Sequence, residues 1–85
     1  MPRTLQEIVG ERVVMLRRRK GLTQPQLAEQ AKMGITTLNR IENAHHVTSI
    51  DKLVALARVL GTSSDYLLGL SEKDEPGEKL PAKAA

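Results

Sequence analysis

The chain has 85 residues, of which 13 are basic and 10 acidic, giving a formal net charge of +3. It has no cysteine, which excludes disulfides and thiolate metal sites and makes a reducing, cytoplasmic location the expectation. Apolar runs such as Val13-Val14-Met15-Leu16 are far too short for a signal peptide or a membrane span, so no membrane association is expected.

The first predicted helix spans about residues 5–20. Thr4 followed by Glu7 forms a capping box, and apolar residues then recur at helical spacing. The basic residues 17–20 fill the last turn, where cations favour the negative end of the helix dipole. Gly21 follows at the position where a left-handed residue ends many helices.

Two short helices follow, at about residues 24–31 and 35–43. Thr23 and Gln26 form a second capping box at the start of the first. Residues 32–34 form a tight turn between the two helices. The inward-facing residues of this pair are expected to be Leu27, Ala28, Ala31, Leu38 and Ile41.

Two further helices are expected at about residues 50–60 and 64–68. Ser49 or Thr48 caps the first of them, and its apolar residues are spaced for burial on one face. No segment alternates with the period of two that is typical of a strand. The sequence therefore predicts one all-α domain over residues 1–70.

Residues 71–85 have a different composition from the rest of the chain. They hold three lysines against four acidic residues, two prolines and one large apolar residue, too little to offset the entropy of ordering. We predict a disordered tail, with folding onto a protein partner as the alternative. The preceding 70 residues hold ten basic and six acidic residues, a net charge of +4 that is compatible with a polyanionic partner.

Two parts of the chain resemble the Cro/phage-repressor-type (XRE) helix-turn-helix family. They are Leu22-Thr-Gln-Pro-Gln-Leu-Ala-Glu-Gln-Ala with Met33-Gly-Ile-Thr-Thr-Leu-Asn-Arg-Ile-Glu-Asn43, and Leu53-Val-Ala-Leu-Ala-Arg-Val-Leu-Gly-Thr-Ser-Ser-Asp-Tyr-Leu-Leu68. The resemblance covers about residues 10–69 and implies a five-helix, lambda-repressor-like fold. It also implies a transcriptional regulator, most often a repressor, that reads double-stranded DNA with helix 35–43 in the major groove.

The sequence departs from the family pattern at the turn. Lys32 stands where the family usually has glycine, so a non-glycine residue is expected to adopt a positive φ there, at some cost. Gly34 replaces the usual serine or threonine cap, and Thr48 replaces a frequent proline. None of these changes removes a residue that is expected to contact DNA.

The resemblance implies a set of DNA-contacting residues. Gln24 would hold a phosphate while its amide braces the start of helix 35–43, although it would also suit a solvated, capped first turn. Arg40 can bind the O6 and N7 atoms of guanine, or it is an ordinary solvated charge. The predicted set is Gln24, Ile35, Thr36, Thr37, Asn39, Arg40 and Asn43.

The other members of this set have their own alternatives. The two threonines can reach a base edge or a phosphate. Ile35 would suit a thymine methyl group or would cover the turn. Asn43 would donate to a phosphate, cap the helix, or do both. Candidate phosphate contacts outside the set are Arg18, His45 and His46.

Three further expectations concern a salt bridge, metal binding and catalysis. The resemblance implies that Arg17 and Glu42 form a salt bridge that holds the recognition helix rigidly. The two adjacent histidines lack partners at metal-ligand spacing, so no metal or cofactor is expected. No catalytic constellation is evident, so the protein is not expected to be an enzyme.

The end of the last helix carries more apolar surface than one short helix should need. Tyr66, Leu67 and Leu70 are therefore the predicted dimer interface, and a homodimer would read a palindromic operator. The alternative function is a protein-interaction role, such as the antitoxin of a toxin–antitoxin pair or a helical adaptor. The tail is the feature that suggests this role, because it would serve as the contact for a protein partner.

Overall fold

The computed structural model describes residues 3–45 and 48–76. Over these ranges the chain forms helices and no strand, which confirms the predicted all-α fold. The first three helices each end one residue before the predicted boundary. In chain order the helices are α1 (Leu5–Arg19), α2 (Gln24–Gln30), α3 (Ile35–Glu42), α4 (Ile50–Leu60) and α5 (Ser64–Leu68). No helix within the described ranges is long and apolar enough to cross a membrane.

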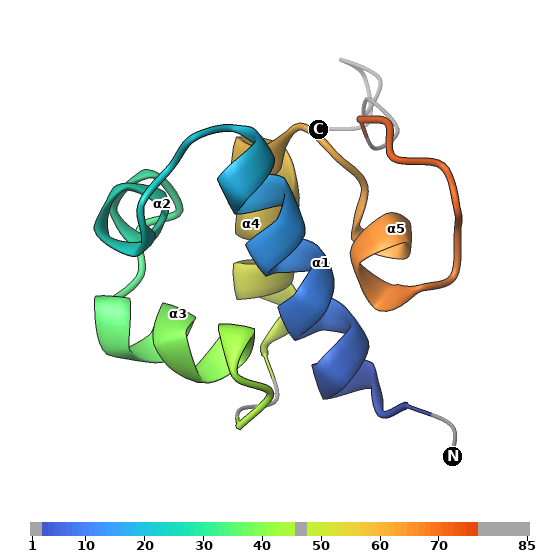
Figure 1. Ribbon diagram of the computed structural model, residues 1–85, viewed down its shortest axis with the longest axis horizontal. Coiled ribbons are helices and arrows are strands. Elements are labelled where there is room, and N and C mark those ends of the chain that lie inside the picture. The colour runs from blue at the N-terminus through green and yellow to red at the C-terminus, as the bar shows by residue number, and fades with distance from the viewer. Residues whose placement is uncertain (1–2, 46–47, 77–85) are drawn as a thin grey trace.

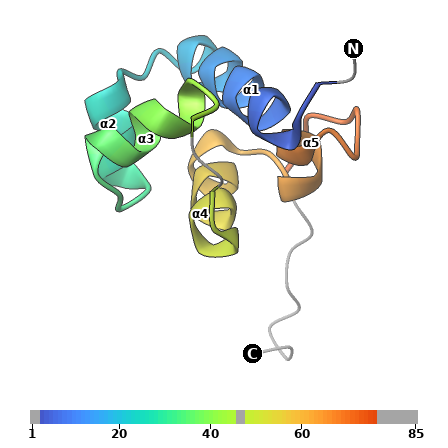
Figure 2. The ribbon, with the colours of Figure 1, turned by 90° about the horizontal axis from the view of Figure 1, so that it is seen from below.

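Helix α1 is the element around which the others are arranged (Figure 1). Figures 1 and 2 place α2 and α3 on one side of α1 and α5 on the other, with α4 packed between these two sides. Helix α1 contacts α3, α4 and α5, and α2 contacts α3 and α4. The pair α2–α3 is therefore supported from behind by both of the longest helices.

The core draws buried side chains from all five helices. Apart from one tyrosine it is entirely aliphatic, as the composition requires. Leu38 and Ile41 of α3 belong to this core and are 0% and 1% exposed. Their burial fixes which face of α3 is turned outward. The buried hydrophobic residues are Val9, Val13, Leu16, Leu27, Ala28, Ala31, Leu38, Ile41, Leu53, Leu56, Ala57, Leu60, Tyr66 and Leu67.

Both predicted capping boxes are present. The Glu7 N–H donates to Thr4 Oγ1 at 3.1 Å, and the Thr4 N–H donates to Glu7 Oε1 at 2.9 Å. Hydrogen bonding from Thr4, first from its backbone N–H and second from its side chain, lowers the pKa of the exposed Glu7 carboxyl group. At α2 the Gln26 N–H donates to Thr23 Oγ1 at 3.2 Å and the Thr23 N–H to Gln26 Oε1 at 2.9 Å. These bonds fix where α1 and α2 begin.

One non-glycine residue with positive φ lies on each side of α3. Lys32 in the preceding turn has φ 57°, as its departure from the family pattern predicts. Ala44, directly after the helix, has φ 62°, which the sequence did not predict. Each left-handed L-residue costs about 1–2 kcal/mol, so both ends of α3 carry local strain.

The structure corrects the predicted dimer interface. Tyr66 and Leu67 are 9% and 0% exposed, because α5 packs its apolar side chains against α1 and α4 within the same chain. The Arg12 guanidinium also covers the Tyr66 ring, at 4.2 Å from its centroid. Of the three predicted interface residues, Leu70 alone is exposed, at 73%.

Residues 71–76, here called the C-terminal segment, are joined to α1 by two arginines. Arg12 Nη1 donates to the backbone oxygens of Tyr66 at 2.7 Å and Ser71 at 3.1 Å. Arg19 Nη1 pairs with Asp74 Oδ2 at 2.7 Å. The predicted disordered tail began at residue 71; its remaining part, residues 77–85, lies outside the described residues.

Candidate nucleic-acid interface

The outward face of α3 carries most of the predicted DNA-binding residues. Leu38 and Ile41 point into the core, so the opposite side of this eight-residue helix faces solvent. Thr37 is half-buried at the edge of this face. Ile35 is a large apolar residue that is 47% exposed at the start of the helix. The other exposed members are Thr36, Asn39, Arg40 and Asn43.

The turn between α2 and α3 is closed by backbone hydrogen bonds. The Lys32 N–H donates to the Glu29 oxygen at 3.1 Å, and the Met33 N–H donates to the Ala28 oxygen at 2.9 Å. Met33 also packs against the core. Gly34 caps α3 without a side-chain bond, as predicted. The turn therefore fixes α3 relative to α2 despite the positive φ of Lys32.

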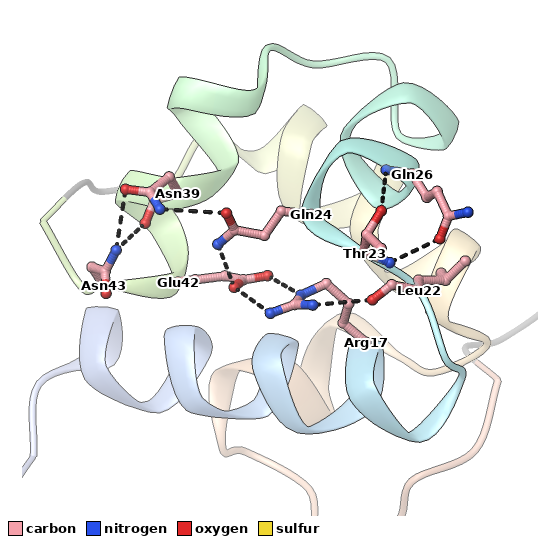
Figure 3. A network of polar contacts seen from close by, with 8 residues as sticks. All are labelled: Arg17, Leu22, Thr23, Gln24, Gln26, Asn39, Glu42 and Asn43. Atoms are coloured by element: carbon pink, nitrogen blue, oxygen red, sulfur yellow. Dashed lines mark hydrogen bonds and ion pairs between the residues drawn. The ribbon is translucent and has the colours of Figure 1, made fainter.

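A salt bridge joins α1 to the end of α3, as the family pattern implied (Figure 3). Arg17 Nε donates to Glu42 Oε2 at 2.7 Å and Arg17 Nη2 donates to Glu42 Oε1 at 3.1 Å. The side chains are 13% and 3% exposed. Arg17 Nη1 also donates to the Leu22 backbone oxygen at 3.0 Å, which holds the chain just before α2. One arginine thus connects α1, the α1–α2 loop and α3.

Gln24, the first residue of α2, extends this connection. Its Nε2 donates to Glu42 Oε1 at 2.8 Å, and its Oε1 accepts from Asn39 Nδ2 at 3.4 Å. The amide was expected to brace the start of α3, and this expectation was wrong. It bonds the second half of α3, because the start of α2 lies beside that half of the helix (Figure 3).

Asn43 caps the end of α3. Its backbone N–H donates to the Asn39 oxygen at 3.0 Å, and its Nδ2 donates to the same oxygen at 2.9 Å and to Asn39 Oδ1 at 3.2 Å. The capping alternative for Asn43 is therefore present in the structure. Its Nδ2 group would have to release one of these bonds to donate to a phosphate.

The basic residues near this face differ in their hydrogen bonds and in whether the structure describes them. Within residues 3–45 and 48–76, Arg40 and Arg18 are exposed and form no ion pair. His45 is exposed beyond α3, with its backbone N–H bonded to the Arg40 oxygen at 2.9 Å. His46 lies outside the described residues. The same described part of the chain holds no group of three or more potential metal ligands.

Sequence reasoning missed two residues with structural roles: Gly10, which positions this interface, and Arg12, which holds α5 and the C-terminal segment. A Cβ at Gly10 would lie 2.8 Å from the backbone oxygens of Ile41 and Glu42, so α1 approaches α3 more closely than a side chain allows. A glycine inside an otherwise amphipathic helix is the signal that could have found it. Arg12, which covers Tyr66, has no comparable signal because its partners are more than fifty residues away.

Comparisons with known proteins agree with this arrangement. Residues 8–68 match the family model of a helix-turn-helix domain. YobD of Bacillus subtilis, an uncharacterized HTH-type transcriptional regulator, is 36% identical over 66 residues, which cover 78% of this chain and 59% of YobD. The HTH-type transcriptional regulator ImmR of the same species is 34% identical over 71 residues, or 84% of this chain and 54% of ImmR. The chain thus spans a little more than half the length of these relatives.

Solved structures of SinR give the same result. A crystal structure of SinR, the master regulator for biofilm formation, in complex with DNA has a TM-score of 0.68 and 33% identity, and the match covers 71% of this chain and 97% of that one. A SinR–SinI complex matches with a TM-score of 0.69 and 33% identity, over 71% of this chain and 59% of that one. From the family match, the relatives and the helix-turn-helix geometry, the chain belongs to the XRE-type helix-turn-helix family of transcriptional regulators.

Proposed function

We propose that this protein is a sequence-specific regulator of transcription that binds double-stranded DNA with α3 in the major groove. The observation that carries the proposal is the outward polar face of α3, which is held by the Arg17–Glu42 pair and by Gln24. A helix fixed in this way can enter the groove without first being ordered, which reduces the cost of binding. Repression by covering a promoter is the mode we propose, without catalysis or a cofactor.

The roles of the side chains follow from where they lie. Thr36 and Arg40 are exposed one turn apart on α3 and are proposed to contact base edges, with Arg40 suited to guanine. Gln24 and Arg18 flank this face and are proposed to contact phosphates. Ile35, at 47% exposure, is proposed to meet a thymine methyl group.

We also propose that the protein binds a palindromic operator as a homodimer. The structure supports this dimer with fewer residues than the sequence suggested, because Tyr66 and Leu67 are buried and Leu70 is the exposed member of the three predicted residues. Two copies related by a two-fold axis would place their α3 helices about 34 Å apart, one turn of DNA. Light scattering that finds only monomers, both free and on DNA, would contradict the dimer.

The experiment that tests the function is selection of bound sequences from random DNA, followed by titration of the best site against salt. We expect an enriched motif with two inverted halves. A dimer that contacts about eight phosphates should give a slope near −7 in the plot of log affinity against log salt concentration. A flat slope with no enriched motif would rule out the proposed function.

The second candidate is a protein-interaction role, as an antitoxin or a helical adaptor. The observation that favours it is the C-terminal segment, which contacts α1 through Arg12 and Arg19. In the SinR–SinI complex, a protein that contains a similar domain is bound to a second protein. In this case the selection would enrich no motif, while a partner protein would co-purify with the full chain.

A further inference from the structure

Four side chains form a continuous chain of hydrogen bonds from the buried ion pair to the exposed face of α3. Glu42 Oε1 accepts from Gln24 Nε2 at 2.8 Å, and Gln24 Oε1 accepts from Asn39 Nδ2 at 3.4 Å. Asn39 Oδ1 in turn accepts from Asn43 Nδ2 at 3.2 Å. Figure 3 shows this chain running from Arg17 and Glu42, beside α1, through Gln24 to Asn39 and Asn43.

The charge on Glu42 determines the direction of the whole chain. An ionised carboxylate can only accept, so Gln24 must turn its Nε2 toward Glu42 and its Oε1 toward Asn39. Asn39 must then turn its Nδ2 toward Gln24 and its Oδ1 toward Asn43. Because the Glu42 side chain is 3% exposed and paired with Arg17 at 2.7 Å, this direction is fixed before any ligand binds.

Counting the hydrogen bonds of residues 3–45 and 48–76, Asn39 keeps one free donor and one free acceptor. A carboxamide has two N–H hydrogens and two acceptor sites on its oxygen, and the chain occupies one of each. Asn39 is exposed, one turn beyond Ile35 on the outward face of α3. A carboxamide that offers one donor and one acceptor matches the N7 acceptor and N6 donor of adenine in the major groove.

Asn39 and Arg40 therefore present different kinds of group to the groove. Within the described ranges Arg40 makes no side-chain hydrogen bond or ion pair, so its long side chain has to be ordered when it binds. The Asn39 amide is held by neighbours on α2 and at the end of α3. A group that is already oriented loses less entropy on binding and tolerates fewer alternative partners.

We propose that Asn39 reads an adenine in each half of the operator and that Glu42, through Gln24, sets the orientation in which it does so. This inference rests on the proposed DNA-binding function and adds a specific base to it. Asn39 is the specificity-determining residue here, whereas Gln24 and Glu42 are positioning residues that act through it.

The test uses the full chain and the operator selected by the wild-type protein. Selection is repeated with Asn39→Ala, and each A·T pair of the operator is replaced in turn by one that contains 7-deazaadenine, which lacks the N7 acceptor. We expect Asn39→Ala to lose the preference for adenine at one symmetric position, by roughly 5- to 150-fold. The deaza substitution at that position should weaken wild-type binding and leave Asn39→Ala unaffected.

Arg40→Ala is the matched control, because it alters the neighbouring exposed residue and should keep the deaza effect at the Asn39 position. An unchanged motif with equally reduced affinity for every sequence would overturn the proposal and leave Asn39 as a spacer between Gln24 and Asn43. An equal deaza effect in wild type and Asn39→Ala would overturn it too. If the wild-type protein selects no motif, the proposed function itself fails, which is a different result.

Discussion

Gly10 of α1 lies directly against the backbone oxygen of Glu42 at the end of α3. A Cβ built at Gly10 would stand 2.8 Å from that oxygen, a distance that real Cβ atoms essentially never show. The same turn of α3 is held from the side by Arg17, whose Nε lies 2.7 Å from Glu42 Oε2. Helix α1 therefore positions α3 in two ways, through the close approach that Gly10 allows and through the charged side chain of Arg17.

Gly10→Ala is expected to destabilise the fold even though alanine is the better helix former. The added methyl group would meet backbone atoms, which cannot rotate away, so α1 and α3 would have to move apart. We expect a loss of about 1–3 kcal/mol, typical of overpacking, in urea unfolding. Gln6→Ala, in the same helix, adds no atom and serves as the control. Equal stability of Gly10→Ala and wild type would contradict the close approach.

The Arg17–Glu42 pair is expected to behave as a buried salt bridge. Arg17→Met would leave the Glu42 carboxylate, 3% exposed, with Gln24 as its remaining side-chain donor. We expect a loss of about 3–5 kcal/mol for this single change. The double variant Arg17→Met/Glu42→Met should be more stable than the single one, because no lone buried charge remains. A double variant less stable than Arg17→Met in denaturant unfolding would argue against this account.

Lys32→Gly is expected to stabilise the protein. At φ 57° a lysine is strained and a glycine is not, although glycine gains entropy in the unfolded chain. The net gain should be of the order of 0.5–1 kcal/mol. Lys32→Ala is the matched control, since it removes the same charge but keeps a Cβ in the left-handed conformation. If both variants show the same midpoint of unfolding, strain at this turn is not the cause.

Arg12→Lys is expected to loosen the C-terminal segment while keeping the charge. Lysine cannot reproduce the guanidinium that covers the Tyr66 ring and bonds the oxygens of Tyr66 and Ser71. We expect a loss of about 1–2 kcal/mol and faster proteolysis between residues 71 and 76. Arg19→Lys is the control, because its pair with Asp74 is exposed and should contribute under about 1 kcal/mol. Unchanged proteolysis of Arg12→Lys would show that the segment is held by other contacts.

The features that could be predicted from the sequence are those with local causes. The capping boxes at Thr4 and Thr23 join residues three apart, so the spacing alone specifies them. The positive φ of Lys32 followed from comparison with one family position. Helix boundaries came within one residue for the same reason, since caps and terminal glycines act within a single turn.

The features that could not be predicted depend on contacts between distant segments. The apolar residues Tyr66 and Leu67 were assigned to an interface because composition does not reveal which surface α1 and α4 will cover. The Gln24 amide was expected to contact the start of α3, but it bonds the second half of that helix. The way in which α2 and α3 cross decides which residues this amide can reach. Ala44 has an unremarkable sequence context, yet it takes a left-handed conformation where the chain leaves α3.

The most direct test of the account compares Arg40→Ala with Gln24→Ala on a panel of DNA sites that differ at single positions. Arg40 is exposed on α3, so its loss should reduce the preference for one base pair by about 1–3 kcal/mol and leave the other positions unchanged. Gln24 lies at the edge of this face, so its loss should weaken all sites by a similar factor, apart from the position read by Asn39, whose amide Gln24 orients. If both variants bind every site as the wild type does, α3 is not the recognition helix.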